Sequence, residues 1–344
     1  MKLGLDYVVV RTHARIADLL TLETMDELAE AEGIHGFLER LEDTPYGKIS
    51  IEGEERVPLA LERIFSEKFI ERIQQIVKLT PAKMGDFLRA YYDMRFEVVN
   101  LKRILRGKYS GVADQEIIDS LIPIESYLAP DHVELAEKET LEDVVKALED
   151  SLYRALGERM DLYRTVGALW PFELTLNSIY SSNILMLVEE LPSQARNMIR
   201  SIVAFETDIE NVLIAIKQRE MSEEARRRFE EMFPVTFSID IKKLKEITEA
   251  KNLRPAIESL GGPYKEVLSP IYAGDIALIR TSLRRNKYEI TKNAKARGEF
   301  GFNVIMAYLV YSEIEKDNLV GLAWGKVQGL PAEELLKYVV IPRD

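Results

Sequence analysis

The chain has 344 residues, a length at which a single hydrophobic core usually gives way to two or three domains. Its formal net charge is −12, so the basic surface typical of nucleic-acid-binding proteins is not expected. The sequence has no cysteine, which excludes disulfides, thiolate catalysis and cysteine-ligated metal sites, and its 3 histidines leave a metal site dependent on carboxylates.

The N-terminus, MKLGLDYVVVRTHAR, lacks the apolar stretch and the cleavage site of a signal peptide. The longest apolar run, at 304–311, is well short of the roughly 20 residues that span a bilayer. Helix-forming residues dominate, and no pattern of alternating strands with glycine or asparagine turns is present. We therefore expect a cytoplasmic, all-α protein without a transmembrane segment.

Taken in chain order, the first recognisable element is a helix–joint–helix segment at 27–46, ELAEAEGIHGFLERLEDTPY. The pattern returns at 134–153, ELAEKETLEDVVKALEDSLY, and in a more divergent form at 246–260, EITEAKNLRPAIESL. Each copy ends at or just before a tyrosine: Tyr46, Tyr153 and Tyr264. We call this pattern the first signature.

Residue types within the first signature indicate where its helices begin and end. Thr24 and Glu27 have the spacing of a capping box, so we predict that Thr24 caps the first helix. The joint carries residues typical of helix caps in all three copies, Gly33, Thr140 and Asn252. Apolar residues then recur at helical spacing and predict a buried face, formed by Ile34, Phe37, Leu38 and Leu41.

A second signature, [DE]-x-x-N-[LV]-x₇-[KR], follows further on in each copy. It reads FEVVNLKRILRGK at 96–108, TDIENVLIAIKQR at 207–219 and IEKDNLVGLAWGK at 314–326. Two signatures in the same order, three times, indicate homologous units of about 110 residues, too long for the turns of a solenoid. We predict three helical repeat domains, at 1–110, 111–221 and 222–344.

The polar positions of the second signature share one helix face with its aliphatic positions, at about 100° per residue. A buried asparagine beside a carboxylate is typical of an internal hydrogen-bond clamp. We therefore interpret the repeated acids and asparagines as structural and not as a binding site: Glu97, Asn100, Asp208, Asn211, Glu315 and Asn318.

Two other patterns resemble functional motifs only superficially. GLAWGKV at 321–327 has one residue too few between its glycines for a phosphate-binding loop, and Val327 replaces the required serine or threonine. Glu32 and His35 match the E-x-x-H fragment of di-iron bundles, but the other copies carry Glu142 and Arg254 at the histidine position. We therefore expect no catalytic residue, cofactor or metal ion.

A basic stretch at 280–297, RTSLRRNKYEITKNAKAR, stands out in an otherwise acidic chain. It contains the following basic residues: Arg280, Arg284, Arg285, Lys287, Lys292, Lys295 and Arg297. Three interpretations stay open: a solvated helix face, a surface for an acidic partner whose approach it would orient electrostatically, and, in third place because the acidic chain would repel phosphate, an RNA-binding surface.

Three segments carry a resemblance to a known family: DYVVVRTHARIADLLTLETMDELAEA near the start, LEDTPYG, and FLRAYYDMRFEVVNLKRILRGKYSG at 87–111. They resemble the C subunit of archaeal and bacterial A/V-type rotary ATPases, related to the d subunit of the vacuolar ATPase, and the resemblance runs over the whole chain. It implies three similar helical domains arranged as a pseudo-threefold funnel, with no chemistry of their own.

The resemblance also implies partners and a place in the cell. The protein would couple the D and F subunits of the central stalk to the rotor ring of proteolipids, in support of proton or sodium transport linked to ATP synthesis or hydrolysis. It would be peripheral at the inner face of the plasma membrane. Two alternatives are a helical scaffold for an unrelated acidic partner and a carboxylate-based metalloenzyme at Glu32 and His35.

Overall fold

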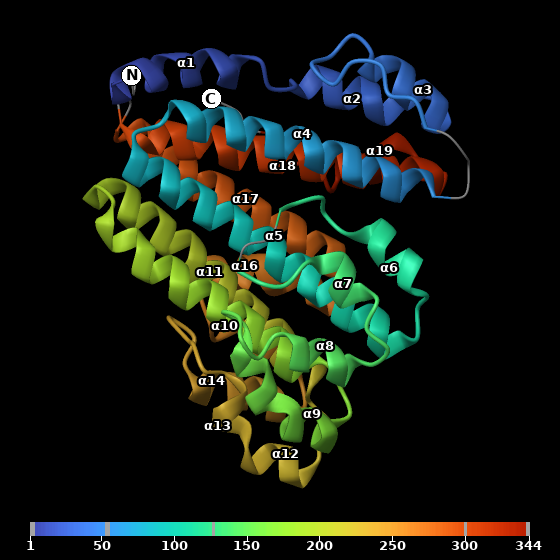
Figure 1. The fold of residues 1–344 in the computed structure, drawn as a ribbon, viewed down its shortest axis with the longest axis vertical. Coiled ribbons are helices and arrows are strands. Elements are labelled where there is room, and N and C mark those ends of the chain that lie inside the picture. The colour runs from blue at the N-terminus through green and yellow to red at the C-terminus, as the bar shows by residue number, and fades with distance from the viewer. Residues whose placement is uncertain (1–3, 52–55, 126–127, 299–300, 342–344) are drawn as a thin grey trace. The chain divides into compact units, whose positions relative to one another are not determined.

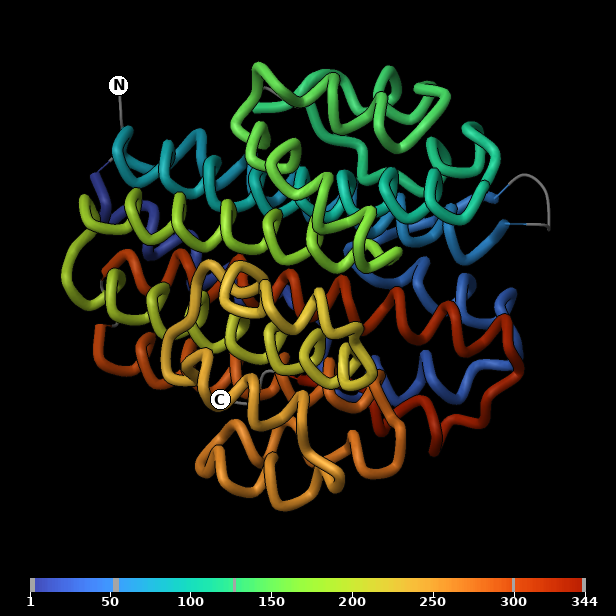
Figure 2. The backbone as a smooth tube through the Cα atoms, turned by 90° about the horizontal axis from the view of Figure 1, so that it is seen from below, coloured from blue at the N-terminus to red at the C-terminus, as the bar shows by residue number. Residues whose placement is uncertain are grey.

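The computed structural model describes residues 4–51, 56–125, 128–298 and 301–341. Throughout these ranges the regular elements are helices, joined by turns and loops of varying length, as Figures 1 and 2 show. The prediction of an all-α fold is therefore confirmed for the described chain. No helix in the same ranges is long and apolar enough to cross a membrane.

The chain divides into two compact units. The first comprises Met1–Arg89, Pro192–Met198 and Ala273–Asp344, and the second comprises Ala90–Leu191 and Ile199–Tyr272. The first unit therefore combines the beginning and the end of the sequence. Two long helices, α5 (Ala82–Ser110) and α11 (Ser193–Lys217), have residues in both units.

The first unit is organised around one long helix near the C-terminus, α18, whose residues 302–315 are all buried. A helix that is apolar on every side has to be covered on every side, and α18 contacts all the other long helices of the unit. In Figures 1 and 2 the N-terminal α2 and α3 lie beside the C-terminal end of α18. The helices of this unit are α1 (Leu5–Ala17), α2 (Leu22–Glu30), α3 (Gly33–Leu41), α4 (Val57–Leu79), α17 (Ile276–Ala296), α18 (Phe302–Val327) and α19 (Ala332–Leu336).

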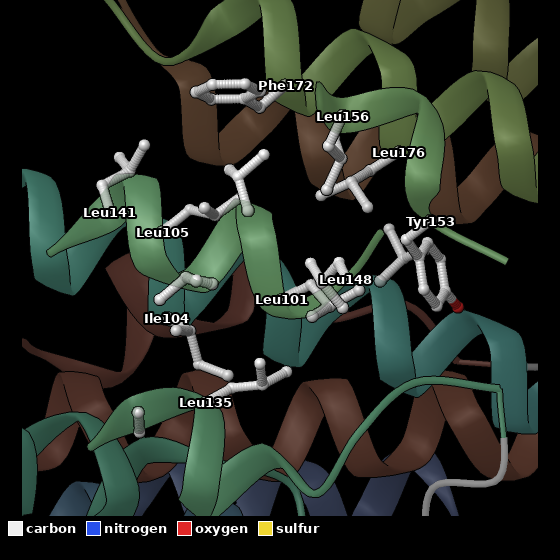
Figure 3. Close-up of a cluster of buried hydrophobic side chains, with 14 of the residues drawn as sticks. Leu101, Ile104, Leu105, Leu135, Leu141, Leu148, Tyr153, Leu156, Phe172 and Leu176 are labelled. Atoms are coloured by element: carbon white, nitrogen blue, oxygen red, sulfur yellow. The ribbon is translucent and has the colours of Figure 1, made fainter. Parts of the chain in front are cut away.

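The second unit has its own apolar core, in which Leu101, Ile104 and Leu105 of α5 belong to one cluster with Leu148 and Phe172 (Figure 3). Apart from α5, α10 and α11, the helices of the second unit are shorter than the long helices of the first. Besides α5 and α11, the helices of the second unit are α6 (Asp114–Ser120), α7 (His132–Ala136), α8 (Leu141–Ala147), α9 (Met160–Val166), α10 (Trp170–Leu187), α12 (Glu223–Arg227), α13 (Phe229–Met232), α14 (Ile241–Glu249), α15 (Leu253–Glu258) and α16 (Gly262–Leu268). Among the described residues, 3₁₀ turns are at Arg154–Arg159, Val188–Glu190 and Ser269–Ala273, the last of which ends at the first residue of the next segment of the first unit.

The first signature forms a helix–joint–helix element in each copy, as predicted: α2 with α3, α7 with α8, and α14 with α15. Two of the predicted caps are also confirmed. Thr140 accepts a hydrogen bond from the backbone N–H of Asp143 at 3.1 Å, and Asn252 accepts one from Arg254 at 3.0 Å. Gly33 opens α3 with φ +63°, a left-handed conformation that glycine adopts without strain.

The predicted cap at Thr24 is wrong. Helix α2 begins at Leu22, and Thr21 caps it by accepting a hydrogen bond from the backbone N–H of Thr24 at 3.2 Å. Two threonines three residues apart offer the same local capping chemistry. The helix extends to the earlier one, which places Thr24 in its first turn.

Candidate functional site

The repeated asparagines bind the backbone of a segment that follows their own helix. Asn100 donates to the carbonyl oxygen of Ile122 at 2.9 Å and accepts from its N–H at 2.8 Å. Asn318 makes the same pair of bonds with Val340, at 2.6 and 3.0 Å. Asn211 donates to the carbonyl oxygen of Val235 at 2.9 Å. Each buried amide therefore satisfies backbone groups that would otherwise lack partners.

The first and third of these asparagines hold equivalent loops. Asn100 and Asn318 each reach a residue 22 positions ahead. Between each asparagine and its backbone partner, the chain leaves the long helix through a glycine with positive φ. This glycine is Gly111, at +68°, after α5 and Gly329, at +72°, after α18. It then returns along a short helix, α6 or α19.

The repeated acids are buried and each accepts a hydrogen bond from a tyrosine of the first signature. Glu97 and Asp208 are 0% exposed and Glu315 is 3% exposed. The three acid–tyrosine pairs are Glu97 with Tyr153 at 2.6 Å, Asp208 with Tyr264 at 2.9 Å, and Glu315 with Tyr46 at 2.8 Å. We call these three pairs the acid–tyrosine clamps.

The positions of the acid and the tyrosine along the chain differ between the clamps. Tyr153 and Tyr264 each follow their acid by 56 residues. Tyr46, by contrast, precedes Glu315 by 269 residues. The last acid in the sequence therefore takes its tyrosine from the first copy of the first signature.

Backbone amides complete the coordination of the acids. Glu97 accepts from the N–H of Leu128 at 3.3 Å, and Glu315 accepts from the N–H of Leu20 at 2.6 Å. Asp208 accepts from three consecutive N–H groups, those of residues 237–239, at 2.8–3.2 Å. A carboxylate surrounded by donors in this way is held in place and is poorly suited to general acid–base chemistry.

The third clamp contains a cation as well. Arg72 of α4 donates to Glu315 at 2.7 Å, and its guanidinium lies 5.4 Å from the centre of the Tyr46 ring. Pairing with a hydrogen-bonded cation offsets part of the cost of burying the carboxylate. The second signature contains no counterpart of Arg72, so the repeat could not reveal it.

Burial changes the acidity of the clamp residues. Burial, and next the negative charge of Glu315, raise the pKa of Tyr46 well above its usual 10.0. Burial also raises the pKa of Tyr264, to about 12, with Asp208 adding to the effect. For Asp208 itself burial raises the pKa, although the hydrogen bonds from Tyr264 and from the backbone oppose this. Both tyrosines are therefore firmly protonated donors at neutral pH.

The repeated basic residue has two kinds of partner. Lys326 donates to the carbonyl oxygens of Ala29 and Ala31 at the end of α2, and Arg219 donates to those of Ala250 and Lys251 after α14. Cations are favourable at helix C-termini. In the first copy Lys108 instead pairs with Asp114, at 2.5 Å.

GLAWGKV lies within α18, and its lysine, Lys326, binds the carbonyl oxygens of α2. Glu32 and His35, which suggested a metal site, are both exposed. Across the described residues no group of three or more His, Asp or Glu side chains is placed to hold a metal ion.

His132 is a polar residue of this region that sequence reasoning missed. It is 5% exposed, and its Nδ1 lies 3.3 Å from Nδ2 of Asn100. Burial lowers the pKa of His132, against the influence of Glu97 and Asp131. No repeated histidine marked the position, because the other copies carry none there.

The basic stretch lies on α17, except for Arg297, which directly follows the helix, and its side chains differ in their surroundings. Arg280, Arg285 and Arg297 are exposed, whereas Arg284 is half-buried and donates to the carbonyl oxygen of Tyr338 at 3.0 Å. Lys292 and Lys295 are also half-buried, each with its ammonium group within 6 Å of a tyrosine ring centre, at 5.7 and 5.9 Å.

The prediction that Lys287 faces a partner is wrong. It is 4% exposed and pairs with Glu313 at 2.7 Å, so it cannot belong to a partner-facing surface. An ammonium group at this depth needs a carboxylate beside it, because burial of an unpaired charge is costly.

Comparison with known proteins gives the family. The model of the ATP synthase (C/AC39) subunit family matches residues 8–338, nearly the whole chain. The chain belongs to this family. The resemblance noted in the sequence is therefore confirmed.

Relatives in the C/AC39 family are similar over most of their length. The C subunit of the A-type ATP synthase of Methanocaldococcus jannaschii is 26% identical over 97% of this chain and 86% of that protein. The corresponding protein of Methanothermobacter thermautotrophicus is 24% identical over 93% of this chain and 83% of that protein. The C/AC39 subunit is a structural component of its complex and not a catalytic one.

Proposed function

We propose that this chain is a non-catalytic central-stalk subunit of an A/V-type ATPase or ATP synthase. It couples the rotor shaft, formed by the D and F subunits, to the membrane ring of proteolipids, and so supports proton or sodium transport linked to ATP synthesis or hydrolysis. Membership of the C/AC39 family and the names of the archaeal relatives support this role. On this proposal the protein lies at the cytoplasmic face of the plasma membrane, peripheral to it.

The observation that carries the mechanical part of the proposal is the recurrence of the acid–tyrosine clamp in all three copies. A part that transmits torque must resist shear between its helices. Buried charge-assisted hydrogen bonds fix the position of one element against another more specifically than apolar packing does. Three repeat domains (1–110, 111–221 and 222–344) arranged as a pseudo-threefold funnel belong to this proposal, because near-equivalent domains suit a seat on a ring of equivalent subunits.

Assembly of the complex with and without this chain tests the proposal. We expect the complete complex to couple ATP hydrolysis to ion uptake into vesicles. The complex that lacks the chain should still hydrolyse ATP but should no longer pump ions, because the shaft has lost its connection to the ring. A fully coupled complex without the chain would contradict the proposal.

The exposed arginines of the basic stretch, Arg280 and Arg285 on α17 and Arg297 directly after it, are available to a partner. We expect Arg280→Gln/Arg297→Gln to weaken recovery of stalk or ring subunits when the chain is used for affinity capture. Lys242→Gln/Lys245→Gln, which removes two exposed charges from α14, is the matched control. Recovery of another acidic protein, with no ATPase subunit, would favour the scaffold alternative.

A further inference from the structure

A cavity of about 500 Å³ lies in the first unit, with walls from α1, α4 and α18. Its volume is within the range of about 300–1,000 Å³ that is usual for small-molecule sites. The floor is formed by Tyr46 and Arg72 of the third clamp together with Tyr308 of α18. Nothing in the stalk function described above requires a cavity at this place.

The cavity has an excess of positive charge in a chain whose net charge is −12. Two carboxylates, those of Asp18 and Glu71, also line it. They are outnumbered by the basic side chains, which are Arg11, Arg15, Lys68 and Arg72.

The two arginines of α1 have neutral partners. Arg11 donates to the hydroxyl of Tyr7 at 3.2 Å, and Arg15 donates to the side-chain oxygen of Gln75 at 2.8 Å. Neither forms an ion pair with a carboxylate among the described residues. Their charges are therefore available to an anion, whereas that of Arg72 is largely offset by Glu315 at 2.7 Å.

A tyrosine hydroxyl at the floor points to a ligand independently of the charges. Tyr308 is 3% exposed and lines the cavity, yet its hydroxyl makes no hydrogen bond with any described residue. The hydroxyl itself is not fully buried, so it opens onto the cavity and can be reached from there. A ligand oxygen in the cavity would supply a hydrogen-bond partner.

We propose that this cavity binds a small phosphorylated anion. The planar guanidinium groups of Arg11 and Arg15 suit the oxygens of a phosphate, and the Tyr308 hydroxyl supplies a further donor from the floor. The volume exceeds what one acidic side chain of a partner would fill, which favours a small molecule over a protein segment. This inference does not depend on the stalk role.

Calorimetric titration of the purified full-length chain with pyrophosphate at physiological ionic strength, where charges outside the cavity are screened, tests the site, with inorganic phosphate and ATP as further ligands. We expect saturable binding to one site. Arg11→Gln/Arg15→Gln should weaken it by at least about tenfold, since charge-assisted hydrogen bonds are lost. Tyr308→Phe should also weaken it, with little effect on the fold, because only the unpaired hydroxyl is removed.

Arg63→Gln/Lys78→Gln is the control, because it removes two exposed charges from α4 outside the cavity. Its affinity should stay within about twofold of the unaltered chain, as expected for screened surface charges. Three outcomes would overturn the proposal. They are no saturable binding, equal weakening by the control pair, and displacement of pyrophosphate by an oligoglutamate peptide that binds more tightly, which would assign the cavity to an acidic protein segment.

Discussion

At the scale of single residues, the three clamps share one arrangement of hydrogen bonds around a buried carboxylate and differ in the remaining donors. Glu97, Asp208 and Glu315 all accept from a tyrosine hydroxyl and from backbone amides. The third clamp adds the guanidinium of Arg72. What is common to them is that a buried carboxylate is stabilised by donors from a segment far along the chain, and this common part determines the cost of removing a donor.

Removal of one tyrosine hydroxyl should destabilise the protein measurably. We expect Tyr153→Phe to lower the free energy of unfolding by about 1.5–3 kcal/mol, because a buried carboxylate loses a hydrogen bond. Urea unfolding followed by circular dichroism measures this. Tyr109→Phe is the control, since its exposed hydroxyl donates to the neutral carbonyl of Gly167, and its cost should be below about 1 kcal/mol. Equal costs for both variants would contradict the assigned role of the clamp.

The raised pKa of Tyr264 predicts a dependence of stability on pH. Because its pKa is 10.0 in the unfolded chain and about 12 in the folded chain, the folded state retains the proton more tightly. The resulting stabilisation is complete below pH 10 and is lost as the pH rises towards 12. We expect the difference in unfolding free energy between the unaltered chain and Tyr264→Phe to shrink above pH 10. A constant difference between pH 9 and pH 11 would contradict this.

At the scale of elements, two glycines allow short helices to approach long ones closely. A Cβ atom added at Gly325 of α18 would lie 2.0 Å from Cδ2 of Leu335 in α19, and one at Gly107 of α5 would lie 2.5 Å from Cγ1 of Ile117 in α6. Both glycines come directly before the basic residue of the second signature. Close packing of the short helix that follows the long one is therefore common to the first and third copies. In the second copy Gln218 takes the place of the glycine.

A pair of substitutions in α18 separates packing from helix propensity. Gly325→Ala should lower the unfolding free energy by about 1–3 kcal/mol, because Leu335 is buried and must move. Gly321→Ala, one turn earlier with nothing within 4 Å of the added carbon, should raise it by up to about 1 kcal/mol. Thermal unfolding of the two variants gives both values. A gain in stability for both would show that α19 yields without cost.

Local sequence patterns correctly predicted many of the helix ends and buried helix faces. Helix caps such as Thr140 and Asn252, and the buried face that includes Phe37 and Leu41, depend on neighbours a few residues away. The partner of Tyr46 could not be predicted in this way, because its acid lies 269 residues further along the chain. The repeated tyrosine and the repeated acid were both visible, but periodicity within a helix gives no information on which copy pairs with which.

At the scale of the whole molecule, the first unit joins segments from the two ends of the sequence. Tyr46 and Leu20 from the N-terminal part bind Glu315 of α18, and Lys326 binds the end of α2. The unit therefore depends on both ends of the sequence, and a substitution in the N-terminal segment should destabilise the C-terminal helices packed against it.

The two tryptophans report on this dependence, because Trp324 lies in the first unit and Trp170 in the second. We expect Tyr46→Phe to lower the urea midpoint reported by Trp324 fluorescence more than that reported by Trp170, measured in variants that retain one tryptophan each. Tyr153→Phe should have the opposite preference, because its clamp lies in the second unit. If Tyr46→Phe shifted both midpoints equally, the units would not unfold separately.

The pairing of Tyr46 with Glu315 also has a consequence during protein synthesis. The N-terminal helices leave the ribosome first, but their partner is translated 269 residues later, which at about 5–20 residues per second is a delay of tens of seconds. Throughout that interval the apolar side chains of α2 and α3 that pack against α18 have no α18 to cover them. The clamps of the second unit have both halves translated within 56 residues of each other. The nascent chain therefore completes its second unit before its first, and the apolar faces of α2 and α3 are exposed for longest.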